Sequence, residues 1–257
     1  MKFDLQTFEN IDISIPLRFN GAQPNAYGVP HASSEPVRAG ELVGDTRQGG
    51  SVNFEQYTFI PHCNGTHTEC VGHITDERIS LRECLQDVIV SAVLVTVEPE
   101  RVNDHAVISA RSFGSHVTAP QAALQAGTLA VQSGKALIVR TLPNDDFKLT
   151  AEYGEANIPP YFTAEAMLFI VECGFTHLLV DMPSIDRLFD DGKLANHRIF
   201  WNVEPGSRQV NADTRIHSTI TEMIYVPNEV EDGEYLLNLQ IAPFESDCAP
   251  SRPILLR

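Results

Sequence analysis

Runs of apolar residues bounded by turn residues predict several short buried strands. Residues 88–97 form a long run rich in β-branched residues, and residues 136–141 and 177–181 are shorter apolar runs of the buried type. Two further runs, at 236–241 and 254–256, predict strands near the C-terminus. The length of the 88–97 run leaves room for a bulge in that strand.

Two segments have the pattern of a helix. One is predicted to begin near Pro120 and to end before Gly134. The other has Thr163 as its N-cap, stops at Gly174, and places its apolar residues on one helical face. Helices that alternate with strands are typical of α/β proteins, and the extra strand patterns favour a mixed sheet. No repeat or linker divides the sequence, so we predict one domain over residues 1–257.

Glycine and proline are concentrated between residues 20 and 52. Such spacing between apolar segments predicts a long loop or hairpin region at the edge of an active site rather than a domain boundary. We expect residues 18–52 to contribute to a pocket there.

The charge of the chain excludes several classes of partner. Its 257 residues include 18 Lys and Arg against 34 Asp and Glu, a net charge of −16. Nucleic-acid binding requires basic residues that neutralise phosphates, so we expect no nucleic-acid partner. For the same reason we expect no binding to an anionic membrane surface.

No apolar run approaches the ~20 residues that cross a bilayer. Five cysteines without a CxxC pair argue against a disulfide scaffold and favour the cytoplasm.

The densest group of metal-binding residue types lies between His62 and His73. His67 and Glu69 are two residues apart, so on an extended strand their side chains leave the same face. His73 follows four residues after Glu69, across Gly72, which allows a turn. Imidazole and carboxylate together suit zinc, manganese or iron. The spacing alone leaves open a chance cluster of histidines, with Cys63 and the other cysteines as ordinary buried residues.

The segment Gly65-Thr66-His67-x-Glu69-x-x-x-His73 resembles the H-x-G-T-H-x-D-x-P-x-H signature of the cyclase family. That family includes bacterial kynurenine formamidases and isatin hydrolase. The order and approximate distances of other family segments agree over most of the chain. These further segments are residues 11–17, 162–166, 179–186, 196–199, 221–222 and 247–252.

The resemblance implies an α/β fold of the swivelling β/β/α type, a mixed sheet flanked by helices. It implies a metal-dependent hydrolase that cleaves a C–N amide bond, in an aryl formamide or a small cyclic amide, with a metal-activated water. The partners it implies are a small-molecule substrate and further copies of the chain, in a dimer or a tetramer.

The resemblance also assigns roles to individual residues. His67 would bind a first divalent ion, Glu69 would bridge two ions, His197 would bind the second, and Glu222 would bind both. His73 would be the general acid/base beside them, because an imidazole titrates near neutral pH. One or two ions, Zn²⁺ or Mn²⁺, are compatible with these ligands.

Three positions depart from the family pattern. The upstream ligand position is occupied by Cys63, and His62 is one residue further back. We favour His62, presented by a one-residue bulge, with the Cys63 thiolate as the alternative. Glu69 replaces an aspartate and is one methylene longer. Val71 replaces a proline, so the turn before His73 is less rigid.

Other interpretations compete with the hydrolase. The same site could serve a metal-dependent lyase, dehydratase or cyclase with His73 as base, or a non-catalytic relative that binds metal or ligand. Asp181 and Asp186 follow a strand end and are candidates either to orient ligands or to cap turns. Outside these groups we interpret His177 as structural, Trp201 as a packing residue, and His31, His105, His116 and His217 as surface groups.

Overall fold

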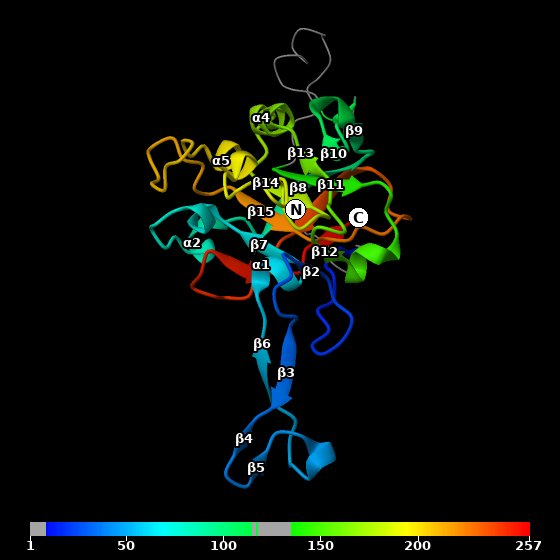
Figure 1. Ribbon diagram of the computed structural model, residues 1–257, viewed down its shortest axis with the longest axis vertical. Helices are drawn as coiled ribbons and strands as arrows, with labels where there is room; N and C mark the ends of the chain where they lie inside the picture. Colours follow the sequence, from blue (N-terminus) through cyan, green and yellow to red (C-terminus); the bar gives the residue numbers. More distant parts are fainter. Residues whose placement is uncertain (1–8, 115–116, 118–134) are drawn as a thin grey trace, which may run out of the picture.

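A nine-stranded mixed sheet forms the centre of the computed structural model, which describes residues 9–114, 117 and 135–257 (Figure 1). The predicted α/β class with a mixed sheet is confirmed. The strands in spatial order are β1 (Asn10–Asp12), β18 (Ile254–Leu256), β16 (Gly233–Asn238), β8 (Ile89–Val97), β11 (Ala136–Thr141), β14 (His177–Val180), β15 (Thr219–Glu222), β7 (His67–Glu69) and β17 (Cys248–Pro250).

The middle of this sheet is parallel and both sides are antiparallel. Strands β8, β11, β14 and β15 run parallel to one another. On one side β16, β18 and β1 are antiparallel, so segments from the two ends of the chain pair as neighbours. On the other side β7 is antiparallel to both β15 and β17.

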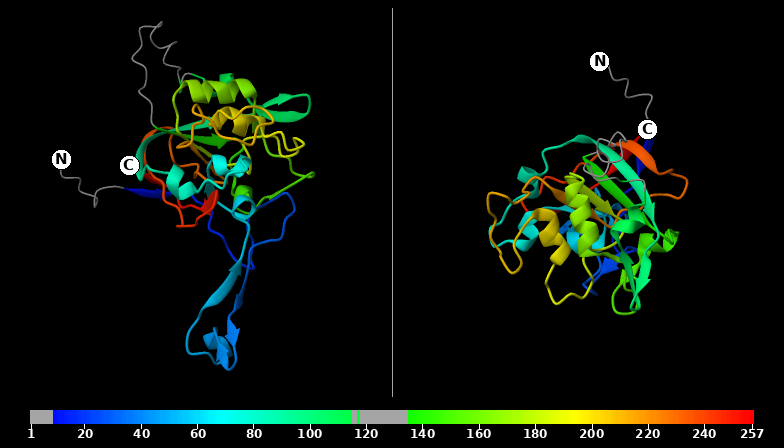
Figure 2. Two further views of the ribbon diagram at one scale, coloured as in Figure 1. Left: turned by 90° about the vertical axis from the view of Figure 1, so that its left-hand side faces the viewer. Right: turned by 90° about the horizontal axis from the view of Figure 1, so that it is seen from above.

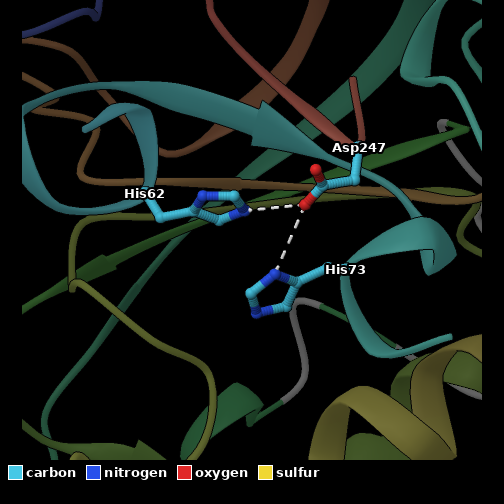
Figure 3. Close-up of side chains that lie close together, drawn as sticks. All are labelled: His62, His73 and Asp247. Atoms are coloured by element: carbon cyan, nitrogen blue, oxygen red, sulfur yellow. Dashed lines mark ion pairs between the residues drawn. The ribbon is translucent and has the colours of Figure 1, made fainter. Parts of the chain in front are cut away.

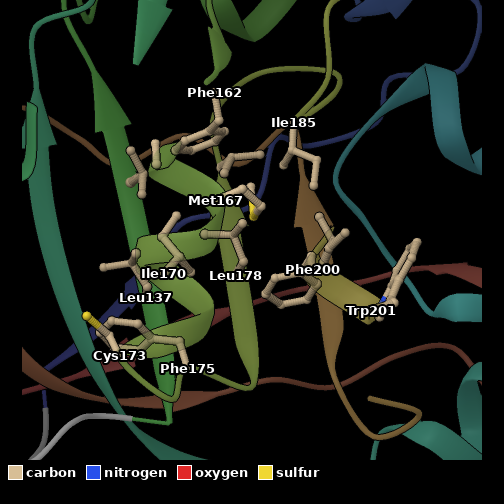
Figure 4. Close-up of a cluster of buried hydrophobic side chains, with 14 of the residues drawn as sticks. Leu137, Phe162, Met167, Ile170, Cys173, Phe175, Leu178, Ile185, Phe200 and Trp201 are labelled. Atoms are coloured by element: carbon tan, nitrogen blue, oxygen red, sulfur yellow. The ribbon is translucent and has the colours of Figure 1, made fainter. Parts of the chain in front are cut away.

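Both faces of the sheet are covered, which explains the continuous apolar runs in its central strands. Leu137 of β11 belongs to a core cluster with Met167 and Ile170 of α4 (Ala164–Glu172), whereas the next residue, Ile138, belongs to a cluster on the opposite face. Figure 4 shows the first cluster, including the predicted packing residue Trp201 on α5 (Ala195–Trp201). As predicted, Thr163 caps α4 by accepting a hydrogen bond from the Ala166 amide.

Smaller elements surround the sheet. The short helices are α1 (Pro61–Asn64) and α2 (Leu81–Cys84), with 3₁₀ turns η1 (Thr46–Gln48), η2 (Val71–Ile74), η3 (Ala110–Phe113) and η4 (Asp146–Thr150). Strands β13 (Tyr161–Phe162), β10 (His105–Ile108) and β9 (Glu100–Val102) form a second sheet, and β12 (Glu152–Tyr153) pairs with β2 (Asn25–Ala26).

A hairpin stands out from the body of the molecule, and we call residues 33–58 the arm (Figures 1 and 2). None of its apolar side chains is buried, and the large ones exposed are Leu42, Val52, Phe54 and Tyr57. Most of the predicted loop therefore points away from the body instead of lining a pocket. The arm consists of β3 (Ser33–Pro36) paired with β6 (Glu55–Thr58), and of β4 (Arg38–Ala39) paired with β5 (Leu42–Val43), followed by η1.

Strands β8, β11, β14 and β18 agree with the predicted bounds to within one residue, and β16 is displaced by three. Strands β11 and β18 have the predicted bounds, and β8 is unbroken. The strand predicted at 236–241 is β16, which begins three residues earlier, at Gly233, because its register follows β8 from Leu94 to Ile89. The helix predicted between Pro120 and Gly134 lies outside the described residues.

All five cysteines are buried and unpaired, in agreement with the expected absence of a disulfide scaffold. Across the described parts of the chain, every helix is too short or too polar to cross a membrane.

His177 is a structural residue, as the sequence indicated. Its Nδ1 lies 2.8 Å from Thr219 Oγ1 and its Nε2 lies 3.3 Å from Asp87 Oδ2. Burial lowers the pKa of this imidazole, and the nearby Asp87 carboxylate only partly opposes the effect. The folded protein therefore holds His177 neutral at pH values where the unfolded chain, with a pKa near 6.5, already binds a proton.

Folding stability should consequently fall as the pH drops through and below about 6.5, and His177→Gln should reduce this loss. Urea unfolding of both proteins at pH 8 and pH 5.5 measures the two differences in free energy of unfolding. All other titrating groups are the same in both proteins, so their contributions to the pH dependence of stability cancel when the two proteins are compared. Equal pH dependence in both proteins would contradict the role given to His177.

Candidate metal centre

Strand β7 brings the candidate ligands together because it is paired on both sides. Its register places His67 opposite Glu222 of β15, and Glu69 opposite Cys248 of β17. His67 and Glu69 lie on the same face, as their spacing predicted, and both are at most 1% exposed. Chain segments more than 150 residues apart thus meet at one strand.

Three overlapping groups of donor atoms converge there. In each group the donor atoms lie within 4.8 Å of one another. Glu69 belongs to two groups and His73 to two, so the groups form one continuous cluster. The groups are His67 with Glu69 and Glu222, Glu69 with His73 and His197, and His62 with His73 and Asp247.

The orientation of the His67 ring is set by the Gly65 carbonyl. Its Nδ1 lies 2.9 Å from the Gly65 carbonyl oxygen, which can only accept, so Nδ1 carries the proton. The opposite nitrogen, Nε2, lies 3.5 Å from Glu222 Oε2 but has no hydrogen-bond partner among the described residues. A buried ring nitrogen with a free lone pair beside carboxylates is the environment that a metal ion would satisfy.

His197 of α5 is held from behind by Asp186. Its Nδ1 lies 2.7 Å from Asp186 Oδ2, and its Nε2 lies 3.1 Å from Glu69 Oε1. The Asp186 carboxylate also accepts hydrogen bonds from the backbone amides of Asn196 and His197. Asp186 therefore both contacts the His197 ring and caps the start of α5. Asp181 has a different place, since it binds Lys148 and Thr141.

The His62 ring lies in the cluster, and the Cys63 thiol is in none of the donor groups found among the described residues. His62 Nε2 is 3.5 Å from Glu69 Oε2 and 3.1 Å from Asp247 Oδ2, without hydrogen-bonding geometry to either. Burial, together with Glu222, raises the pKa of Cys63 to about 11. The short helix α1, rather than a bulge, presents His62.

Asp247 is the site residue that the sequence analysis missed. Its Oδ2 faces two imidazoles, His62 at 3.1 Å and His73 Nδ1 at 3.5 Å (Figure 3). The family's closing motif begins at this residue, and that was the one feature pointing to it.

The turn that carries His73 requires Gly72, because a Cβ there would lie 2.3 Å from the Ile79 carbonyl oxygen.

The charges of the cluster are mutually dependent. Burial raises the pKa of Glu69, but the imidazoles of His73, His197 and His62 outweigh it and hold that pKa well below its ordinary range. Burial likewise lowers the pKa of His197, but Asp186 and Glu69 raise it well above the usual value. The Glu69 carboxylate is thus ionised beside a His197 ring that holds its proton, and a bound cation would take the place of that proton.

The cluster opens into a cavity of about 610 Å³. Its lining includes five residues of the cluster: His62, Glu69, His73, His197 and Glu222. The remaining wall includes Tyr27, which comes from the glycine-rich N-terminal region, and the segment 183–194. The early part of the predicted loop does therefore contribute to the pocket.

A family model described as putative cyclase matches residues 11–187, more than two thirds of the chain. The chain belongs to the cyclase family. Curated relatives match along nearly the whole length. The kynurenine formamidase of Bacillus thuringiensis (strain Al Hakam) is 28% identical, and that of Bacillus anthracis 26% identical, each over 98% of this chain and 99% of the relative.

Solved structures share the cyclase-family fold. A predicted metal-dependent hydrolase from Bacillus stearothermophilus superposes with a TM-score of 0.62 at 15% identity, over 97% of this chain and 98% of that one. Isatin hydrolase A from Labrenzia aggregata superposes with a TM-score of 0.63 at 12% identity, over 97% of this chain and 93% of that one.

Asp186→Asn should weaken metal binding by about 10–100-fold, because the amide lacks the charge that orients the His197 ring. Titration calorimetry with Zn²⁺ or Mn²⁺ measures the affinity. Asp191→Asn is the matched control, since Asp191 lies in the same loop, is largely exposed, and among the described residues forms an ion pair with Lys193 alone. The same affinity in both variants would show that Asp186 does not act on the ligand.

Proposed function

We propose that the protein is a metal-dependent hydrolase that cleaves a C–N amide bond, in an aryl formamide or a small cyclic amide. The observation that carries the proposal is the buried Nε2 of His67, left without a hydrogen-bond partner beside the carboxylates of Glu69 and Glu222. Relatives named kynurenine formamidase, and a neighbouring structure named isatin hydrolase, support this bond type.

The ligands in this proposal are those implied by the sequence resemblance. His62, His67, Glu69, His197 and Glu222 would hold one or two divalent cations, Zn²⁺ or Mn²⁺, since imidazole and carboxylate suit both elements. When bound, such a cation lowers the pKa of water and polarises the scissile carbonyl.

His73 would move the proton. Its side chain is partly exposed to the cavity, and its Nδ1 faces the carboxylate oxygens of Asp247 and Glu69. The second ring nitrogen, Nε2, points away from Asp247 (Figure 3). Asp247 would orient the ring through this 3.5 Å ion pair, so that Nε2 could pass a proton to the departing nitrogen, as in other carboxylate–histidine pairs.

His73→Ala should abolish amide hydrolysis while leaving the metal content unchanged, because His73 is assigned a proton-transfer role and no ligand role. Glu69→Ala is the contrasting variant and should lose most of the bound metal, since Glu69 is assigned as the carboxylate that binds both ions and is buried beside His197. Elemental analysis of purified proteins, together with hydrolysis of formanilide and related amides, measures both. Analysis of the native protein also decides the element and the number of ions.

Two outcomes would overturn this assignment. Loss of metal from His73→Ala would make His73 a ligand. A metal-replete native protein that hydrolyses no amide, ester or lactone, yet binds small aromatics, would favour a non-catalytic relative.

We also propose that residues 1–257 form one domain located in the cytoplasm and that copies of it assemble into a dimer or a tetramer. Pairing of β1 with β18 supports a single unit. The arm supports assembly, because an isolated hairpin is marginally stable in water and this one buries no apolar side chain. A symmetric contact with a second copy would cover it.

Replacing Val52 and Tyr57 together by serine should shift the assembly toward monomers, because both side chains would lose their apolar contact surface. Light scattering after gel filtration measures the mass. Phe147→Ser is the control, since Phe147 is similarly exposed but lies outside the arm. A monomeric native protein, or equal dissociation by the control, would contradict the proposal.

A further inference from the structure

A second cavity, of about 940 Å³, is lined by helices α4 and α5, which pack against each other (Figure 1). We call this cavity the groove. Its apolar lining includes Leu168 and Val171 of α4, Ile199 of α5, and Val203 and Pro205 of the segment that follows α5. A cavity of this size and character accommodates the apolar part of a small ligand.

The groove is distinct from the cavity of the donor cluster, although the two are neighbours. Gly192 lines both cavities, whereas Leu194 lines only that of the donor cluster and Ala195 lines only the groove. On α5, His197 belongs to the donor cluster, and the next residue, Arg198, lines the groove. None of the candidate metal ligands lines the groove. A ligand bound there would therefore contact the helix that carries His197 without touching the metal centre.

Positive charge exceeds negative charge in the lining of the groove. It includes three cations, Lys193, Arg198 and Arg215, and one carboxylate, that of Glu204. Across the described parts of the chain, neither arginine forms an ion pair with a carboxylate. The whole protein has a net charge of −16, so its surface as a whole repels anions. The groove is thus a local exception that favours an anion.

Arg198 is held by backbone carbonyl oxygens instead of a carboxylate. Its Nε donates to the carbonyl oxygen of Lys193 at 3.0 Å, and its Nη1 donates to those of Glu204 at 3.1 Å and Ser207 at 2.6 Å. Its Nη2 donates to no group within the described residues. Carbonyl oxygens orient a guanidinium but carry no net charge. Arg198 therefore keeps an uncompensated positive charge and a donor group for a ligand.

Arg215 carries a second uncompensated charge. It donates to the carbonyl oxygens of Phe175 and Phe200, and its guanidinium carbon lies 4.8 Å from the centre of the Phe200 ring. Burial lowers the pKa of this guanidinium, and no nearby carboxylate opposes the effect. A half-buried charge without a counter-charge is unfavourable, so an anion beside it would stabilise this part of the fold.

We propose that the groove is a second binding site, for a small amphipathic carboxylate. The apolar part of the ligand packs against Leu168, Val171 and Ile199, and its carboxylate accepts charge-assisted hydrogen bonds from the arginines of the groove. The proposal does not depend on the hydrolase function, because the groove contains none of the residues assigned to hydrolysis.

The test uses 2-naphthoate and 2-naphthalenemethanol, which share a ring system and differ in charge. Titration calorimetry should give the native protein at least about tenfold higher affinity for 2-naphthoate, the usual size of a hydrogen bond to a charged group. Arg198→Gln should remove most of this preference. Arg101→Gln is the matched control, because Arg101 is exposed on β9, outside the groove, and its loss changes the net charge equally.

A second pair of variants leaves the carbonyl contacts of Arg198 intact. Leu168 lines the groove from α4 and is 49% exposed, so the helix tolerates a polar side chain there. Leu168→Glu should bind 2-naphthoate at least about tenfold more weakly than Leu168→Gln does, because the two side chains have the same length and only Glu repels the carboxylate.

Four outcomes would overturn the inference. The first is equal affinity of the native protein for the two compounds, and the second is the same loss of preference in Arg101→Gln as in Arg198→Gln. The third is equal affinity of Leu168→Glu and Leu168→Gln for 2-naphthoate, which would place this compound at the metal centre instead. The fourth is a lower mass of Leu168→Glu than of the native protein in light scattering, which would make the groove a contact between copies of the chain.

Discussion

Burying the carboxylate of Glu69 in the sheet would cost several kcal/mol if it stood alone. It is tolerated because three imidazoles lie close to it, those of His62, His73 and His197, and because Asp247 faces the first two and Asp186 holds the third. The cluster is therefore a set of charges that are stable only together. Strand β7 makes this possible, since hydrogen bonds to β15 and β17 prevent the carboxylate from turning toward water.

The helix that carries His197 is positioned by side chains rather than by its own length. Helix α5 has seven residues, and Leu194 before it adopts a left-handed conformation with φ of 49°, which is unfavourable for a leucine. Asp190 accepts a hydrogen bond from the Leu194 amide, and Asp186 accepts hydrogen bonds from the buried amides of Asn196 and His197. The same short acidic segment that supports the ligand thus also stabilises the strained turn.

Local patterns were sufficient for the strands and for part of the site. The alternation of side chains along a strand placed His67 and Glu69 on one face, and apolar runs located β11 and β18. Both predictions succeeded because these features depend only on residues that are neighbours in the sequence. Asp247 was missed because its role comes from a position beside β7 that only the folded sheet creates. The arm was not distinguished from a loop, since glycine and proline mark both. The register of β16 depends on β8, which no local pattern encodes.

The burial of all five thiols determines where the protein can be labelled chemically. Burial raises the pKa of Cys173 to about 11, as it does for Cys63, and none of the five side chains is more than 7% exposed. Alkylating reagents attack the exposed thiolate, so we expect burial of the five thiols to slow the reaction of the folded protein with maleimides. A single cysteine placed at the tip of the arm would therefore accept a fluorescent or spin label selectively, without removal of the native ones.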